Sequence, residues 1–189
     1  MRAETPHPLI ILYLQGLTDV DRWTLLGLSG DLWVTSPATE AGEGRERMFQ
    51  GEFSNNMDDK GRVSIPASFR DVLNSCHADG KIIITRSHNT PCLIAYPTRE
   101  WNRLQAAIKD MPANIKRNFI RAVITPSQSF SPDKQGRVLL AGVLREHAAL
   151  SRIVHFAGTG ETFEIWDKAS WDKQLEADLL ALQDFELDM

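Results

Sequence analysis

The feature of this sequence that most constrains its fold is an internal repeat. When the chain is shifted by 75 residues, residues 57–70 align with 132–145, so that Asp58 meets Asp133 and Gly61 meets Gly136. The same shift pairs Arg62 with Arg137, Val63 with Val138, and Arg70 with Arg145. A second block aligns at a shift of 70, where Leu93 meets Phe163, Tyr96 meets Trp166, and Trp101 meets Trp171. Because both blocks occur in order, the sequence indicates a duplicated unit whose copies differ in length by five residues in a loop.

Each copy predicts a strand, a glycine turn, a second strand, a short helix, two strands and a longer helix. In the first copy, Val63 and Ile65 alternate with Ser64, which is typical of a half-buried strand. The β-rich runs 81–85 and 92–96 follow, separated by a turn. We expect helices over 98–108 and then to about residue 123. The last predicted helix carries Trp171, Leu175, Leu179 and Leu182.

Strands this short are not stable alone, so we expect the two copies to pair into one pseudo-symmetric β unit. The predicted fold class is α+β, with helices flanking a duplicated β unit. We divide the chain into a first repeat (52–100), a helical connector (101–126), a second repeat (127–170), and a C-terminal helix with an acidic tail (171–189). Strand edges that remain uncovered favour contacts between subunits.

The first 47 residues differ from the rest, because they show no durable helical or strand period. Met48 makes a natural beginning for the folded unit. We therefore expect 1–47 to be a disordered or non-native N-terminal extension, such as translation from an upstream start codon. The alternative is a targeting or regulatory arm, although nothing in the segment resembles a known address.

Charge is distributed unevenly along the chain, whose formal net charge is −4. Residues 1–47 sum to −3, residues 48–125 to +4, and residues 126–189 to −5. One segment can therefore hold a basic face while the whole chain stays acidic. No apolar run approaches the roughly 20 residues of a membrane helix. Two cysteines suit a reducing cytoplasm and argue against a disulfide scaffold.

The two glycine turns contain the candidate binding residues. Glycine at 61 and 136 permits a positive φ, and Asp58 and Asp133 can accept backbone amides and fix each turn. The guanidinium groups of Arg62 and Arg137 can bind phosphate or guanine, and Lys60 and Lys134 add positive charge for the DNA backbone. The alternative is that each arginine simply pairs with its own aspartate. The repetition favours DNA, because two presented arginines can engage successive features of a duplex.

These residues carry a resemblance to a known family. The motifs are Met48-Phe49-x-Gly51, Asp58-x-Lys60-Gly61-Arg62-Val-Ser-Ile-Pro66-x-x-Phe-Arg70, Pro91-Cys92-Leu93, Tyr96-Pro97, Trp101, Asp133-x-x-Gly136-Arg137, Leu144-Arg145 and Phe163-Glu164-Ile165-Trp166. Together they resemble the MraZ family, over residues 48 to about 175.

The resemblance implies a bacterial transcription factor built from two SpoVT-AbrB-type swapped-hairpin units. It implies a homo-oligomeric ring in the cytoplasm, associated with the nucleoid, that binds short tandem G-rich DNA repeats. It also implies repression of the protein's own operon and of the division and cell-wall gene cluster. The family's DNA-contacting loop corresponds here to Asp58–Arg62 and, by duplication, to Asp133–Arg137. Family members usually begin at the Met-Phe pair, which supports the interpretation of residues 1–47 as an extension.

Two departures from the family pattern occur in the second copy. Ala141-Gly142 lacks the proline that commonly follows the strand, and Gln135 stands where the first copy has Lys60. The second loop is thus expected to be less basic or less rigid, so we expect Arg62 to contribute more than Arg137.

Two other function classes make different demands on the sequence. Enzyme motifs for nucleotide binding, acyl transfer and zinc hydrolysis are absent from the sequence, so we expect no enzyme, no cofactor and no small-molecule substrate. Cys76, His77, His88 and Cys92 have irregular spacing for zinc, and we expect no metal. Trp101, Trp166 and Trp171 are expected in the core rather than stacked on bases. The remaining rival is an oligomeric scaffold or an antitoxin-like protein whose acidic C-terminal helix binds a partner.

Overall fold

The structure, a computed structural model, describes residues 48–76, 80–183 and 185. The expected extension 1–47 and most of the tail beyond residue 183 lie outside the described residues. The first copy contains β1 (Glu52–Asn56), β2 (Arg62–Ser64), α1 (Ala67–Cys76), β3 (Ile82–Arg86), β4 (Leu93–Pro97) and α2 (Thr98–Ile108). The helix α3 (Ala113–Phe119) and the π-type turn η2 (Ile120–Ile124) then lead to the second copy. That copy contains β5 (Gln128–Phe130), β6 (Arg137–Leu139), α4 (Gly142–His147), β7 (Ile153–Gly158), β8 (Phe163–Asp167) and α5 (Lys168–Ala181).

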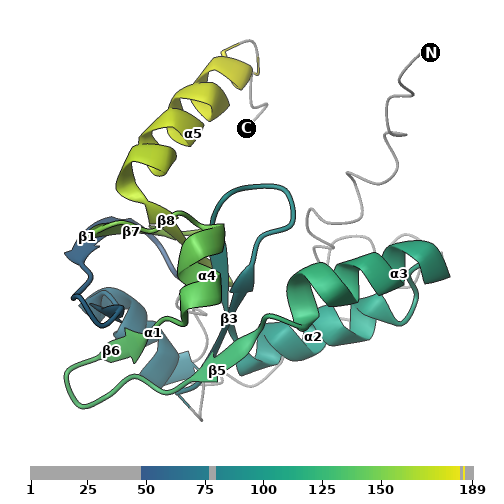
Figure 1. Ribbon diagram of the computed structural model, residues 1–189, viewed down its shortest axis with the longest axis horizontal. Coiled ribbons are helices and arrows are strands. Elements are labelled where there is room, and N and C mark those ends of the chain that lie inside the picture. The colour runs from purple at the N-terminus through teal and green to yellow at the C-terminus, as the bar shows by residue number, and fades with distance from the viewer. Residues whose placement is uncertain (1–47, 77–79, 184, 186–189) are drawn as a thin grey trace, which may run out of the picture. The chain divides into compact units, whose positions relative to one another are not determined.

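The two copies interleave their strands rather than forming separate sheets. Six strands form one antiparallel sheet in the order β1-β7-β8-β4-β3-β5, and β2 pairs with β6 in a separate two-stranded ribbon (Figure 1). The first strand of each copy pairs with the third strand of the other, β1 with β7 and β5 with β3. The fold is therefore α+β, and it is built from an exchange of strands between the repeats.

Pairs of equivalent strands lie at the centre of this arrangement. In the β2–β6 ribbon, Val63 is directly opposite Val138, which is its equivalent at the shift of 75. In the large sheet, Ile94 of β4 is opposite Glu164 of β8, its equivalent at the shift of 70. Residues at equivalent positions of the two copies can be direct cross-strand neighbours only where a two-fold axis that relates the copies passes between them. The repeat in the sequence thus appears in the structure as a pseudo-two-fold axis.

One hydrophobic core takes its side chains from both copies. Phe69 of α1 lies 5.0 Å, between ring centroids, from Phe163 of β8, and Phe49 lies 5.5 Å from Phe69 in an edge-to-face contact. Val63, Ile65 and their counterparts Val138 and Leu140 are also buried in this cluster. Because the core draws its side chains from both copies, packing as well as strand exchange joins the repeats.

Two of the three tryptophans expected in the core are buried, and the third is only partly so. Trp101 and Trp166 are buried, as the sequence predicts for core residues. Trp171 is half-buried and stacks on the ring of His155 at a centroid distance of 4.9 Å. His155 is itself buried, and its Nδ1 lies 3.0 Å from the Ser54 hydroxyl. The stacked pair fixes the first turn of α5 against the sheet.

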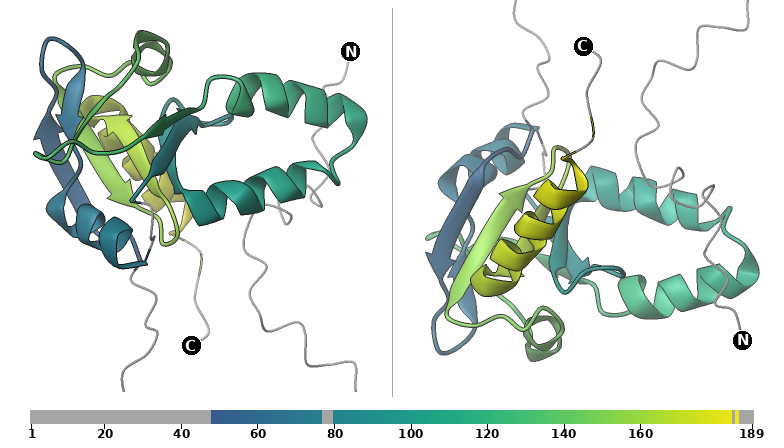
Figure 2. Two further views of the ribbon diagram at one scale, coloured as in Figure 1. Left: turned by 90° about the horizontal axis from the view of Figure 1, so that it is seen from below. Right: turned by 90° about the horizontal axis from the view of Figure 1, so that it is seen from above.

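Helices at two ends of the sheet remain largely uncovered. Figure 2 shows α2 and α3 extending from the sheet as a helical projection, and no residue of α3 is buried. The α5 helix begins on the sheet, but its residues from Glu176 onward are exposed. None of the helices in the described ranges is long and apolar enough to cross a bilayer. The fold therefore presents two helical surfaces as well as the glycine turns.

Candidate nucleic-acid interface

The first glycine turn is held closed by one aspartate. Asp58 Oδ1 accepts hydrogen bonds from the backbone N–H groups of Lys60 (3.0 Å) and Arg62 (2.9 Å). The Gly61 N–H donates to the Asp58 carbonyl (2.8 Å), and Gly61 has a φ of +85°. A residue with a Cβ resists that conformation, so the turn requires glycine at this position. The corner that carries Arg62 is thus fixed by its own backbone.

The second turn repeats this geometry. Asp133 Oδ1 accepts from the backbone N–H groups of Gln135 (2.8 Å) and Arg137 (2.9 Å). Gly136 donates to the Asp133 carbonyl at 2.7 Å and has a φ of +73°. The loss of the proline and the change to Gln135 do not alter this backbone network. Any difference between the turns must therefore come from their side chains.

The β2–β6 ribbon places both candidate arginines on the same face. The register pairs Arg62 with Leu139, Val63 with Val138, and Ser64 with Arg137. The two valines are buried, and side chains alternate along a strand, so the other four residues lie on the opposite, solvent-facing side. Arg62 and Arg137 are then diagonal neighbours, which in antiparallel pairs lie roughly 7–8 Å apart. The solvent-facing side of the ribbon thus forms a four-residue platform with Arg62 and Arg137 at two diagonally opposite corners.

Each arginine forms an ion pair with the aspartate of its own turn, which is the alternative that the sequence left open. Arg62 Nε lies 2.7 Å from Asp58 Oδ2, and Arg137 donates to Asp133 Oδ2 from both Nε (3.0 Å) and Nη2 (2.9 Å). The simplest interpretation of the turn has both arginines projecting freely into solvent. The structure instead holds each one in an ion pair. Their side chains are nevertheless 38% and 32% exposed, and such exposed pairs are weak.

The geometry of the first ion pair leaves a binding edge on Arg62. Only its Nε takes part in the pair with Asp58, so the edge formed by the two terminal nitrogens stays outside it. That edge is the part of a guanidinium that matches two acceptors side by side, such as guanine O6 and N7. Arg137 has one of its terminal nitrogens engaged as well. The structure thus gives Arg62 the more available donor set.

Each turn also lowers the pKa of its own aspartate. Backbone hydrogen bonds from Arg62, followed by the Arg62 guanidinium, hold the pKa of Asp58 below its ordinary value. The backbone and then the side chain of Arg137 lower the pKa of Asp133 in the same way. Both shifts favour the ionised carboxylate, which is the form that accepts the backbone N–H groups in each turn.

Two further arginines contribute to the site and were not among the sequence candidates. A Cβ placed on Gly61 would lie 2.9 Å from Arg145 Nε, and one placed on Gly136 would lie 2.5 Å from Arg70 Cδ. Each helix arginine therefore packs on the turn of the other copy. The signal was present, because Arg70 aligns with Arg145 in the repeat. Arg70 and Arg145 thus add to the positive charge that Lys60, Arg62, Lys134 and Arg137 bring to the turns, beside the carboxylates of Asp58, Asp59 and Asp133.

The close approach of Arg70 makes a testable difference between two glycines. Gly136→Ala is expected to cost about 1–2 kcal/mol for the left-handed backbone, plus the displacement of Arg70. Gly160→Ala is the matched control, because Gly160 also has a positive φ (+92°) but no atom within 4 Å of an added Cβ. Urea unfolding of both variants measures the two costs. Equal losses of stability would show that the contact with Arg70 is unimportant.

The cysteine and histidine residues considered for zinc do not form a described site. His77 lies outside the described residues, and Cys92 is buried with its thiol 3.2 Å from the Thr90 hydroxyl. Burial raises the pKa of the Cys92 thiol to about 12. Within the described ranges, no three His, Cys, Asp or Glu side chains gather as ligands for a metal ion.

Comparison with known proteins agrees with the arrangement of the repeats. The family model of the MraZ protein, described as antitoxin-like, matches residues 48–119 and 123–186, so that each matched segment holds one copy. A transcriptional regulator MraZ from Pseudoalteromonas translucida (strain TAC 125) is 39% identical over 144 residues, covering 74% of this chain and 93% of that protein. A transcriptional regulator MraZ from Proteus mirabilis (strain HI4320) is 36% identical, covering 72% and 90%.

A third relative gives a similar match. The transcriptional regulator MraZ of Acidithiobacillus ferrooxidans (strain ATCC 53993 / BNL-5-31) is 37% identical over 131 residues, covering 66% of this chain and 86% of that protein. These relatives are named as regulators and not as enzymes. With both repeats matched and most of each relative covered, this chain belongs to the MraZ family.

Proposed function

We propose that this protein is a transcriptional regulator that binds double-stranded DNA in a sequence-specific manner through its two glycine turns. The observation that carries the proposal is the β2–β6 ribbon, which presents Arg62 and Arg137 on one solvent-facing side. The turns hold these arginines in place before any ligand arrives, which lowers the entropic cost of binding. Family membership supports the regulatory role.

In the proposed mechanism the side chains of the two turns contact DNA directly, and an oligomer repeats these contacts along the duplex. Arg62 contacts a base edge with its terminal nitrogens, and Lys60, Lys134 and Arg137 contact phosphates. One such platform makes few contacts and binds weakly. Several platforms in an oligomeric ring, meeting tandem short repeats, turn the later contacts into intramolecular events and raise the avidity by about 10² to 10⁴. The outcome is repression of the protein's own operon and of the division and cell-wall genes, at the nucleoid in the cytoplasm.

Footprinting of the full chain on its own upstream DNA tests this proposal. We expect protected sites at a regular spacing, together with binding that weakens steeply as salt is raised, because phosphate contacts release counterions. The same chain on an unrelated fragment of equal length is the control and is expected to give no regular pattern. Protection without a repeat spacing would contradict the tandem arrangement, and no protection would contradict DNA binding.

The second candidate is an oligomeric scaffold or antitoxin-like protein. The family's antitoxin-like description and the exposed leucines of α5 favour it. It requires that a neighbouring gene product co-purifies with the chain while the upstream DNA stays unbound. The footprint therefore discriminates between the two candidates.

A further inference from the structure

The C-terminal half of α5 carries an apolar stripe that continues beyond the sheet. Trp171, Leu175, Leu179 and Leu182 are spaced as i, i+4, i+8 and i+11, so they lie along one side of the helix. Trp171 and Leu175 are half-buried, whereas Leu179 and Leu182 are 59% and 57% exposed. The same stripe that anchors the helix therefore runs on without a partner in the described part of the chain, and Figure 1 shows that this end of α5 extends away from the sheet.

Acidic side chains flank this stripe on both sides. At about 100° per residue, Glu176 lies on one side of the Leu175–Leu179–Leu182 line and Asp178 on the other. From residue 174 to the end of the chain, every charged residue is acidic: Glu176, Asp178, Asp184, Glu186 and Asp188. A surface that covers the leucines would meet negative charge at its rim, which favours a basic partner.

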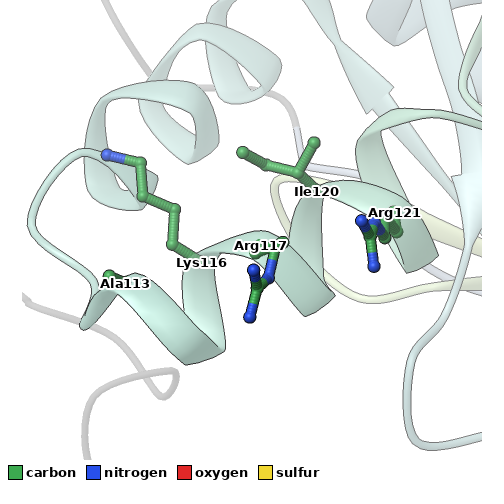
Figure 3. Close-up of a pocket in the computed structure, with 5 residues that line it drawn as sticks. All are labelled: Ala113, Lys116, Arg117, Ile120 and Arg121. Carbon is green, nitrogen blue, oxygen red and sulfur yellow. The ribbon is translucent and has the colours of Figure 1, made fainter.

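The helix α3 and the π-helix η2 that follows it carry the complementary pattern. Ala113 and Ile120 line a shallow hollow together with Lys116, Arg117 and Arg121, as Figure 3 shows. Within α3, Lys116 and Arg117 lie about 100° apart around the helix and so fall on opposite sides of Ala113, and Arg121 follows in η2. Ile120 is 37% exposed, and the segment 113–124 contains no acidic residue. The hollow is thus an apolar floor with a cationic rim.

The two arginines of the hollow are available for a partner. Lys116 Nζ donates to the Lys109 carbonyl at 3.2 Å, so part of its donor capacity is used within the helical projection. The side chains of Arg117 and Arg121 are exposed and form no ion pair or hydrogen bond with another described residue. Two guanidinium groups that pair with none of the described residues, beside an exposed isoleucine, match carboxylates beside exposed leucines.

We infer that the leucine stripe of α5 in one copy of the chain docks in the basic hollow formed by α3 and η2 of a second copy. The inference rests on the oligomer in the proposed function and names its contact. Because α5 and α3 present different surfaces, the contact is head-to-tail, and repetition of such a contact closes into a ring when the rotation permits. The occupant is a second copy because both complementary surfaces occur in this chain, and Figure 1 shows α5 and the α2–α3 projection apart from each other.

The mass of the full chain in solution, without DNA, tests the docking. Size-exclusion chromatography with light scattering is expected to give a multiple of 21.3 kDa for the wild type and a single chain for Leu179→Asp/Leu182→Asp. Leu180→Asp is the matched control, because Leu180 is 58% exposed but lies off the stripe, and it is expected to keep the wild-type mass. Arg117→Glu/Arg121→Glu is also expected to give the mass of a single chain. Its control is Lys173→Glu, on the side of α5 away from the stripe, which is expected to keep the wild-type mass.

Mixing the two disrupted variants gives the decisive result. Each retains the surface that the other lacks, so an equal mixture is expected to form one contact and a mass near twice 21.3 kDa, which also shows that both are folded. A mixture in which every protein keeps the mass of one chain overturns the inference. A wild type that is itself a monomer also overturns it, whether the stripe is covered by residues 1–47 or by nothing. Arg117→Glu/Arg121→Glu with wild-type mass but weaker DNA binding overturns it too, by assigning the hollow to DNA. Because mass is measured without DNA, failure here is separate from failure of DNA binding.

Discussion

Arg62→Ala in the full chain is expected to weaken binding to the upstream DNA at least about 100-fold. One bidentate arginine–guanine contact is worth about 1–3 kcal/mol of discrimination, and each copy in an oligomer loses the same contact. Arg62→Lys keeps the charge but not the planar fork, so we expect an intermediate loss. Arg137→Ala is expected to lose less, because its guanidinium donates to Asp133 through two nitrogens. Fluorescence anisotropy at one fixed salt concentration measures all three variants.

The loss of Arg62 also leaves Asp58 without its cation, and that charge alone would repel DNA. The double variant Asp58→Asn/Arg62→Ala separates the two effects. We expect it to bind as poorly as Arg62→Ala, since the missing group is the one that contacts DNA. Recovery of wild-type affinity would mean that the arginine acts only by neutralising the carboxylate. Lys173→Ala, remote on α5, is the control for a general loss of positive charge.

Phe69→Ala is expected to destabilise the fold by about 3–5 kcal/mol, the usual cost of truncating a buried phenylalanine. Phe69 is fully buried and contacts Phe49, Phe53 and Phe163 within 5.5 Å between ring centroids. The cavity opens between α1 of one repeat and β8 of the other, so it weakens the junction of the copies. This cost is a large fraction of the about 5–15 kcal/mol that holds a typical domain together.

Urea unfolding followed by circular dichroism measures this effect, at one protein concentration because assembly adds to apparent stability. Leu180→Ala is the control, since an exposed leucine is expected to change stability by less than about 0.5 kcal/mol. A single transition at a lower urea midpoint is the expected result for Phe69→Ala. Two separate transitions would show that the repeats unfold independently, which the shared core contradicts.

Local structure was largely predictable from the sequence. The bounds of α2 agree with the predicted 98–108, because the positions of Trp101 and Ile108 fix the buried face and Pro97 marks its start. The buried alternation of Val63 and Ile65 was equally plain. Such signals depend on a few neighbouring residues, so single-chain patterns are sufficient to read them.

What the sequence could not specify depends on contacts between distant residues. The exchange of β1 and β5 between copies follows from registers that no local pattern encodes. The spacing of Asp58 and Arg62 allowed both a paired and a projecting arginine, and only the side-chain geometry showed the pair. Arg145 was visible as a repeat position, but its packing on Gly61 requires knowledge that α4 lies beside the other copy's turn.

The exchange of first strands has a consequence for synthesis of the protein. Ser54 of β1 bonds to His155, 101 residues further along the chain. While the ribosome is still translating the second repeat, the emerging first repeat lacks the strand that completes its sheet edge. The nascent chain must therefore wait, with β1 unpaired, until nearly all of the polypeptide has left the exit tunnel, and chaperones that shield exposed strands have that interval in which to act.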